Sequence, residues 1–306
     1  MAERQAPETG NNDIHAGFIA LTGRPNVGKS TLLNALVGRK VSIVTHKPQT
    51  TRHRIMGVRH EPGYQFVFVD TPGIHLNAKK ALNKALNKAA QQTLGDVDVV
   101  VFMIEAGRWT EEDENVLQQL KDRENVVLVV NKVDRMDNKD DLLPFIADVS
   151  ERVGASAVVP LSALKADNLD ALLNELRGRL EDTVAFFPEE QVTDRDDRFQ
   201  VAEIIREKLM NRLHEELPYA LTVTVDEMED DNGLLRIAAT IWVERDGQKK
   251  IVIGKKGEML KTIGKLAREE LEGRYGQKVF LQLWVKLRDS WSDDVRLLKQ
   301  FGIQED

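Results

Sequence analysis

The chain has 306 residues, of which 42% are hydrophobic and 30% are charged, the composition of a globular protein with about two domains. The lack of cysteine excludes disulfides and cysteine-ligated zinc, and the lack of any apolar run of about 18 residues argues against a membrane span. The net charge of −7 excludes a protein that is basic all over, although it leaves room for a local basic patch. Residues 1–16 are polar without an apolar signal sequence, so we expect a flexible tail on a cytoplasmic protein.

A phosphate-binding loop is predicted near the N-terminus. Gly23–Ser30 is a complete Gly-x-x-x-x-Gly-Lys-Ser sequence between the apolar run Gly17–Thr22 and the helical pattern Thr31–Val37. In this setting backbone N–H groups point at phosphate oxygens, Lys29 faces the β- and γ-phosphates and Ser30 ligates Mg²⁺. A glycine-rich turn that matches by chance is the alternative. The predicted nucleotide-binding residues of this loop are Gly23, Arg24, Pro25, Asn26, Val27, Gly28, Lys29, Ser30 and Thr31.

A candidate switch segment follows the loop. The polar stretch Gln49–His53 precedes an expected strand at 64–69. A threonine there can complete a Mg²⁺ shell only while a γ-phosphate is present, so the segment would order with triphosphate and relax after hydrolysis. The sequence does not decide between Thr50 and Thr51, and we favour Thr51. An ordinary polar loop is the alternative.

A second Mg²⁺ motif, Asp70–Gly73, begins where the strand at 64–69 ends. The Asp70 carboxylate can hold Mg²⁺, and the Gly73 N–H can meet a γ-phosphate. A simple strand-ending turn is the alternative, because Asp, Pro and Gly are turn formers. We predict that Asp70, Thr71, Pro72 and Gly73 contact the nucleotide and its metal, and that the Mg²⁺ ligands are Ser30, Thr51 and Asp70.

The remaining elements up to residue 185 alternate between strand and helix. Strands are expected at 97–104, 125–130 and 156–160 in addition to 64–69, and helices at 79–94, 111–120 and 169–180. Runs that are apolar throughout suit strands buried on both faces of a sheet. The alternation predicts an α/β domain at 17–185 with a mostly parallel sheet, in which ligands bind at the carboxyl ends of the strands.

Base selection is predicted for Asn131–Asp134, which follows the strand at 125–130. The Asp134 carboxylate can accept two hydrogen bonds from guanine but none from adenine, Asn131 can tie the loop, and the Lys132 stem can cover the base. A polar strand end is the alternative. The weaker triplet after the strand at 156–160, whose backbone N–H groups can meet the guanine carbonyl oxygen, consists of Ser162, Ala163 and Leu164.

The order of elements changes after a proline-containing acidic segment at 186–197, which we predict to be a linker. An α+β order follows: a helix at 199–217, strands at 220–227 and 234–243, an apolar segment at 251–253, a helix at 258–275 and a strand at 278–287. We therefore expect a smaller second domain at 198–306 with a C-terminal helix. Trp284 and Trp291 can stack on bases, but we expect both in the core.

The second domain contains a Gly-x-x-Gly loop formed by Gly254, Lys255, Lys256 and Gly257. Two glycines let a nucleic-acid backbone approach closely, and the lysines attract phosphate, so such a loop clamps about four nucleotides of single strand. A helix-entry turn with solvated lysines is the alternative. Further basic residues around the loop are Lys249, Lys250, Lys261, Lys265 and Arg268.

Together these motifs resemble a known family. The set Gly23–Ser30, Gln49–His53, Asp70–Gly73, Asn131–Asp134 and Ser162–Leu164 resembles the five motifs of translation-factor-related GTPases, and the Gly-x-x-Gly domain resembles a KH module. From about 18 to 301 the chain is similar to the Era family of bacterial ribosome-assembly GTPases. The resemblance implies GTP hydrolysis to GDP with Mg²⁺, for which we expect Lys29, Thr51 and Gly73 to be the catalytic groups.

The resemblance also implies partners. It implies that the KH domain binds the 3′ end of 16S rRNA under GTP or GDP control during maturation of the 30S subunit. It further implies peripheral association with the cytoplasmic face of the inner membrane, although no anchor is evident, and DNA is not expected. One alternative is a non-catalytic RNA-binding module with a regulatory GTP site. A GTPase of tRNA modification is disfavoured, because no added catalytic domain or reactive cysteine is present.

Water activation is the point at which the sequence departs from many GTPases. Ile74 stands where a glutamine often orients the attacking water, and isoleucine cannot hold water. We therefore predict slow intrinsic hydrolysis and interpret His75 as a residue of a mobile loop rather than a base. Related GTPases with a hydrophobic residue at this position use a P-loop asparagine to bind K⁺, so the resemblance suggests K⁺ binding by Asn26. Stabilisation of the loop turn by Asn26 is the alternative.

Overall fold

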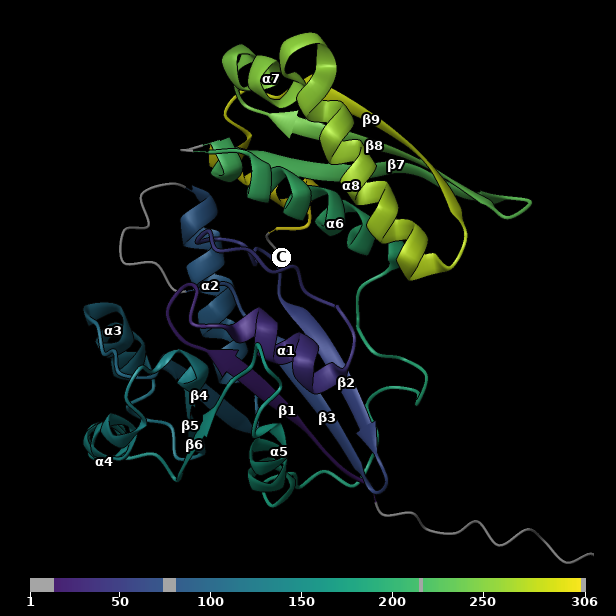
Figure 1. Ribbon diagram of the computed structural model, residues 1–306. Helices are drawn as coiled ribbons and strands as arrows, with labels where there is room; N and C mark the ends of the chain where they lie inside the picture. Colours follow the sequence, from purple (N-terminus) through teal and green to yellow (C-terminus); the bar gives the residue numbers. More distant parts are fainter. Residues whose placement is uncertain (1–13, 74–80, 215–216, 304–306) are drawn as a thin grey trace, which may run out of the picture.

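The computed structural model of the protein describes residues 14–73, 81–214 and 217–303, so most of the expected tail, together with Ile74 and His75, lies outside the described residues. A six-stranded sheet with its helices forms one part of the molecule, and a three-stranded sheet with its helices forms the other (Figure 1). Among the described helices, none has both the length and the hydropathy that crossing a bilayer requires.

The larger sheet has the strand order β2-β3-β1-β4-β5-β6. Its strands are β1 His15–Thr22, β2 Ile55–Glu61, β3 Tyr64–Asp70, β4 Val99–Glu105, β5 Val126–Asn131 and β6 Ala157–Leu161. Only β2 runs antiparallel to its neighbour, so the predicted mostly parallel α/β sheet is confirmed. The sequence analysis missed β2 because its second half, Arg59–Glu61, is polar and only partly buried at the sheet edge.

Helices cover both faces of this sheet. The helices are α1 Lys29–Val37, α2 Ala81–Gly95, α3 Glu111–Gln119, α4 Leu142–Val153 and α5 Leu169–Arg177. Alternate residues of β4 enter different cores: Val101 packs with the apolar side chains of α1 and α5, and Phe102 packs with those of α2, α3 and α4. Burial on both faces explains why these strands are apolar throughout and why their polar groups gather at the strand ends.

The smaller part has the order α-β-β-α-α-β followed by a C-terminal helix, so the predicted α+β order is confirmed. Its elements are α6 Asp197–Arg212, β7 Leu221–Asp231, β8 Leu234–Val243, α7 Asp246–Ile253, α8 Glu258–Tyr275, β9 Lys278–Leu287 and α9 Val295–Gln300. The sheet order is β7-β8-β9, and the apolar residues of α6 and α8 pack on one face of it. The apolar segment 251–253 is the last turn of α7. Short 3₁₀ helices lie at Val133–Arg135, Lys139–Asp141, Leu217–Tyr219, Lys255–Gly257 and Trp291–Asp293.

The expected linker runs along the edge of the larger sheet. The N–H of Val58 in β2 donates to the carbonyl oxygen of Val192 over 2.9 Å. The chain then enters α6 at Asp196, whose carboxylate caps the helix by accepting from the N–H of Phe199 over 2.8 Å. The domain bounds 17–185, 186–197 and 198–306 remain predictions.

The two tryptophans of the C-terminal part have different environments. Trp291 is completely buried and packs with Leu82 and Leu86 of α2 and with α9, so the expectation of a core residue is confirmed for it. The same expectation is wrong for Trp284, whose side chain is 43% exposed. Trp284 points to the face of the three-stranded sheet opposite α6 and α8, which pack on the other face.

Candidate functional site

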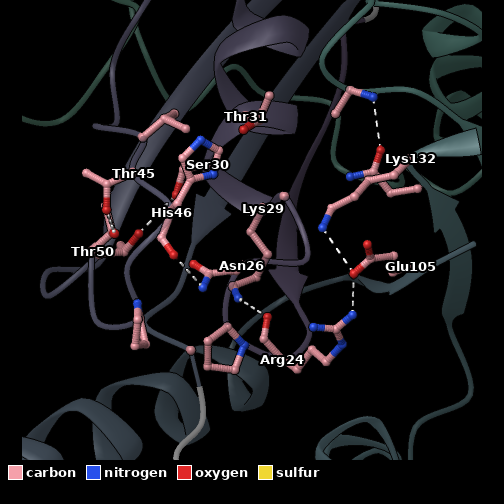
Figure 2. Close-up of a pocket in the computed structure, with 18 of the residues that line it drawn as sticks. Arg24, Asn26, Lys29, Ser30, Thr31, Thr45, His46, Thr50, Glu105 and Lys132 are labelled. Carbon is pink, nitrogen blue, oxygen red and sulfur yellow. Dashed lines mark hydrogen bonds and ion pairs between the residues drawn. The ribbon is translucent and has the colours of Figure 1, made fainter. Parts of the chain in front are cut away.

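The predicted nucleotide motifs meet in one cavity of about 710 Å³ at the carboxyl ends of β1, β4 and β5 and the N-terminal end of α1 (Figure 2). The predicted residues that line it are Arg24, Pro25, Asn26, Gly28, Lys29, Ser30, Thr31, Thr51, Gly73, Asn131, Lys132, Asp134, Ala163 and Leu164. The predicted residues that lie buried behind the lining are Gly23, Val27, Asp70, Thr71, Pro72 and Ser162. Residues far apart in the sequence therefore form one site.

Asn131 holds the loops of the cavity together. Its Nδ2 donates to the carbonyl oxygen of Val27 over 2.8 Å, and its Oδ1 accepts from the N–H of Ala163 over 3.0 Å. A Cβ atom on Gly28 would lie 2.3 Å from Asn131 Nδ2, and Gly28 has a φ of 115°. Only glycine fits at that position, both because of this close approach and because of its backbone conformation.

Lys29 lies within the curl of the phosphate-binding loop. Its Nζ donates to the carbonyl oxygens of Gly23 over 2.9 Å and Arg24 over 3.1 Å. Burial lowers the pKa of Lys29 to about 8, although the nearby Asp70 carboxylate opposes this shift. The side chain is therefore an ammonium at pH 7, held where the loop's N–H groups would surround phosphate.

The predicted metal ligands converge at one point. The Ser30 hydroxyl donates to Asp70 Oδ2 over 2.6 Å, and the Thr51 hydroxyl lies 3.0 Å from Ser30 Oγ and 3.2 Å from Asp70 Oδ2. Ser42, which the sequence analysis missed, also donates to Asp70 Oδ2 over 3.0 Å. Burial raises the pKa of Asp70, and its Oδ1 is buried without a hydrogen-bond partner among the described residues. Hydroxyl and carboxylate oxygens with an unsatisfied buried acceptor fit Mg²⁺.

The geometry separates the two candidate switch threonines. The Thr50 hydroxyl is 2.6 Å from Thr45 Oγ1 (Figure 2) and donates to the carbonyl oxygen of Lys47 over 2.7 Å. In contrast, the Thr51 hydroxyl faces the predicted metal ligands Ser30 and Asp70. Asn26 donates from Nδ2 to the carbonyl oxygen of His46 over 2.9 Å, which ties the phosphate-binding loop to the same segment. The structure thus brings Thr51, and not Thr50, to the side chains of Ser30 and Asp70.

The two loops that are predicted to select the base are joined by a side-chain contact. Ser162 Oγ donates to Asp134 Oδ1 over 2.6 Å, and Ser162 Oγ also accepts from the N–H of Lys165 over 3.2 Å. Lys132 has a φ of 65°, and its Nζ pairs with Glu105 over 3.1 Å (Figure 2). The Asp134 carboxylate thus lines the cavity in a fixed orientation, in a position to accept hydrogen bonds from a base.

Several lining residues were missed by the sequence analysis. They are Ile43, Val44, Thr45, His46, Lys47, Pro48, Glu105, Arg108, Glu112 and Arg135. Glu105 pairs with both Arg24 and Lys132 and stands directly beside Asn131 in the register of β4 and β5. Its place at the carboxyl end of a strand was the signal that could have identified it. No comparable pattern marks Ile43–Pro48.

The Gly-x-x-Gly loop lies outside the nucleotide cavity. It forms the turn between α7 and α8, and Lys255 and Lys256 are exposed. Gly254 has a φ of 74°, and a Cβ atom on it would lie 2.7 Å from Met259 Cβ. Glycine therefore allows the tight entry into α8 that presents both lysines to solvent.

Comparison with known proteins gives consistent results for both parts of the chain. Residues 18–132 match the family described as 50S ribosome-binding GTPase, and residues 216–292 match the KH domain family. GTPase Era of Xanthomonas oryzae pv. oryzae (strain MAFF 311018) is 54% identical over 290 residues, which are 94% of this chain and 97% of that protein. GTPase Era of Histophilus somni (strain 129Pt) is 49% identical over 292 residues, which are 95% and 97% of the two chains.

Two crystal structures are similar over nearly the whole molecule. Era in complex with MgGDPNP and nucleotides 1506–1542 of 16S ribosomal RNA has a TM-score of 0.92 at 39% identity and covers 95% of this chain and all (100%) of that one. A point variant of Era from Aquifex aeolicus bound to GDP and AlF₄⁻ has a TM-score of 0.91 at 39% identity with the same coverage of 95% and 100%.

We predict that Asp134→Asn changes base preference. The amide replaces one acceptor of the guanine N–H groups with a donor, which leaves a mismatched pair and lowers guanine nucleotide affinity about 10- to 100-fold. Xanthine has a carbonyl oxygen where guanine has its amine, so the variant should bind xanthine nucleotides better than the wild type does. Titration with fluorescent GDP and XDP measures both changes, and an unaltered ratio of the two affinities would contradict the assignment.

We predict that nucleotide affinity depends on pH through Lys29. Phosphate beside Nζ favours the ammonium and raises its pKa above the value of about 8 that burial gives it. Above about pH 8, GDP binding is therefore coupled to the uptake of a proton by Lys29. GDP affinity should be constant below that pH and should fall by up to about tenfold for each pH unit above it. Calorimetry at constant Mg²⁺ between about pH 7 and 9 tests this prediction, which a level affinity across that range would contradict.

Proposed function

This chain belongs to the Era family of GTPases, and we propose that it is a nucleotide-controlled RNA-binding factor in the assembly of the small ribosomal subunit. It is a GTPase with GTP or GDP as ligand, Mg²⁺ as cofactor and a C-terminal KH domain. The observation that carries the proposal is the direct bonding of the switch segment Gln49–His53 to the KH domain.

The RNA we propose is the single-stranded 3′ end of 16S rRNA. The similar Era structure holds nucleotides 1506–1542 of 16S ribosomal RNA, and this chain has the exposed Gly-x-x-Gly loop that a KH domain needs. We propose the residues Gly254, Lys255, Lys256 and Gly257 as the backbone clamp. Because 16S rRNA is part of the small subunit, we propose the 30S subunit as the partner. A cytoplasmic location with peripheral association at the inner membrane rests on the family resemblance alone.

We propose that the protein promotes GTP hydrolysis mainly by placing positive charge and a backbone N–H group beside the phosphates. Lys29 is held to neutralise the β- and γ-phosphates, and Gly73 offers its N–H to the γ-phosphate. Ser30, Thr51 and Asp70 would hold Mg²⁺, which supplies positive charge between the phosphates when bound. None of these groups orients the attacking water, and Ile74 has no polar atom on its side chain. We propose that intrinsic hydrolysis is slow for this reason.

The switch segment contacts the KH domain on both sides of its metal-facing residue. The carbonyl oxygen of Thr50 accepts a hydrogen bond from Arg206 of α6. The guanidinium of Arg52 donates to the carbonyl oxygens of Leu221 over 2.7 Å, Tyr219 over 3.0 Å and Pro218 over 3.1 Å. Thr51 stands between these two anchors and faces Ser30 and Asp70. Any change in the position of Thr51 therefore changes both anchors.

Both anchors are buried, so breaking their hydrogen bonds costs free energy. Arg52 and Arg206 are each only 1% exposed. Glu203 holds Arg206 through two contacts of 2.7 Å, and Arg52 lies 5.9 Å from the ring centroid of Trp291. A buried guanidinium that loses its acceptors is costly, so a change in the conformation of residues 50–52 would destabilise this arrangement of the two domains. We propose that triphosphate and diphosphate favour different arrangements of the domains in this way.

We predict that hydrolysis depends on K⁺. If the Asn26 side chain helps to bind K⁺ beside the phosphates, replacement of K⁺ by Na⁺ should slow single-turnover GTP hydrolysis at least several-fold, and Asn26→Ala should remove the difference. Equal rates in both salts would assign Asn26 to loop stabilisation alone, consistent with its contact to His46. Absence of hydrolysis under any cation would favour the non-catalytic module.

We predict that the double variant Glu203→Gln/Arg206→Met loses nucleotide control of RNA binding. Both partners are replaced because loss of one alone would leave a buried charge at a cost of about 3–5 kcal/mol. The measurement is RNA affinity with a GTP analogue and with GDP, and we expect the ratio of the two affinities to approach one in the variant.

The matched control for this experiment is Arg177→Met. It removes a salt bridge to Glu61 within the GTPase domain, remote from α6. We expect the control to keep the wild-type ratio of RNA affinities. Equal RNA affinity of the wild-type protein with GTP analogue and GDP would contradict the proposed switch, and crosslinking with sequencing of the bound RNA identifies the ligand in each state.

A further inference from the structure

We infer that the open face of strand β9 is a second RNA-contact surface, on which bases of a single strand stack after they leave the Gly-x-x-Gly loop. We name it the β9 platform, and it consists of Lys278, Phe280, Gln282, Trp284 and Lys286. The inference rests on the RNA binding proposed above and extends the contact beyond the about four nucleotides that a KH loop clamps.

The platform follows from the alternation of side chains along β9. Val279 and Val285 are buried in the apolar cluster that α6 and α8 form with the sheet. All five platform residues are exposed, and the aromatic ones, Phe280 and Trp284, are exposed by 46% and 43%. Two large rings on one strand thus lie open to solvent, although the opposite face of the same sheet is well packed. Exposed aromatic surface of this kind marks a recognition site.

The order of residue types suits a single-stranded nucleic acid. Phe280 and Trp284 lie four positions apart, about 13 Å along the strand, so each ring can take a different base. Gln282 stands between them, with an amide that both donates and accepts hydrogen bonds. Lys278 and Lys286 stand at the two ends, where they can meet phosphates. Stacking on either ring requires no particular base, because every base has a flat face.

The charges on the neighbouring strands favour an RNA path along β9. β9 has no acidic residue, whereas β7, two strands and about 10 Å away, carries Asp226, Glu227 and Glu229, all exposed. These carboxylates repel phosphate and confine a polyanion to the β9 side of the sheet. Arg236 of β8, which is paired with Asp231 over 2.9 Å, lies over Phe280 at 5.6 Å from the ring centroid, where its guanidinium plane can stack beside a base.

The strand that carries the platform lies next to the helices that flank the Gly-x-x-Gly loop. β9 is an edge strand of the described sheet, and α7 and α8, which flank the loop, contact it on the packed face, opposite the platform (Figure 1). An RNA strand that leaves the loop between these helices reaches the platform by passing around the edge of β9, without crossing another described strand. Because the platform is lined by cations and aromatic rings rather than by aliphatic side chains, RNA fits it better than an apolar protein surface does.

The test is a comparison of RNA lengths. Affinity of the full-length protein with a GTP analogue is measured by fluorescence anisotropy for two probes from the 3′ end of 16S rRNA, one of about four nucleotides and one of about twelve. Phe280→Ala/Trp284→Ala should weaken binding of the longer probe about tenfold or more and change that of the shorter probe less than about twofold. Trp284→Phe, which keeps a stacking ring, should bind almost as the wild type does.

Two controls separate this inference from the proposed function. Lys255→Ala/Lys256→Ala should weaken binding of both probes, and Leu143→Ala, which removes a 75% exposed apolar side chain from α4, should weaken neither. Thermal unfolding and GTP hydrolysis show that each variant folds.

Wild-type affinity of the aromatic variant for the longer probe would overturn the platform and leave the proposed function intact. Loss of a protein contact in the small subunit without loss of RNA affinity would also overturn it, since the surface would then be a protein-docking site. Failure of the wild-type protein to bind either probe would contradict the proposed function itself.

Discussion

The arrangement of the two domains depends on three consecutive residues, Thr50, Thr51 and Arg52. The middle residue faces Ser30 and Asp70, and its two neighbours are bonded to the KH domain through Arg206 and through the carbonyl groups of residues 218–221. One short stretch of backbone therefore belongs to the proposed Mg²⁺ site and to the domain interface at the same time. The guanidinium groups at this interface are buried, so their hydrogen bonds cannot be exchanged for water without cost.

Other contacts support the same interface from both domains. His53 Nδ1 is 2.9 Å from the carbonyl oxygen of Gly302, and burial lowers the pKa of His53 to about 4, so the ring is neutral at pH 7 and donates to that carbonyl. Lys40, just after α1, pairs with Glu207 and Glu270 over 2.7 Å each. Trp291 packs against α2, which follows the segment after Gly73. The KH domain is thus held by residues that precede Thr51 in the sequence and by residues that follow it.

The Gly-x-x-Gly loop, the proposed RNA clamp, lies away from this interface. Glu270 near the end of α8 contacts the GTPase domain, whereas the Gly-x-x-Gly loop stands before the first turn of the same helix (Figure 1). Glu270 lies about 18 Å along α8 from the start of the helix, and the loop does not line the nucleotide cavity. Control of RNA binding would therefore act through the orientation of the whole KH domain. The β9 platform would move with it, because β9 and α8 belong to one packed unit.

The sequence alone determined the class of each domain and the motifs of the nucleotide site, because these depend on short local patterns. Gly28 has no room for a side chain, a phosphate-binding loop has a lysine at the position of Lys29, and strands buried on both faces are apolar, so each can be identified from the local sequence. The positions that only the tertiary structure decided have no local pattern. Ser42, Glu105 and the buried guanidinium of Arg52 have partners that lie far away in the chain. Trp284 and Trp291 look alike in the sequence, and only the packing of α2 and α9 decides which of them is buried.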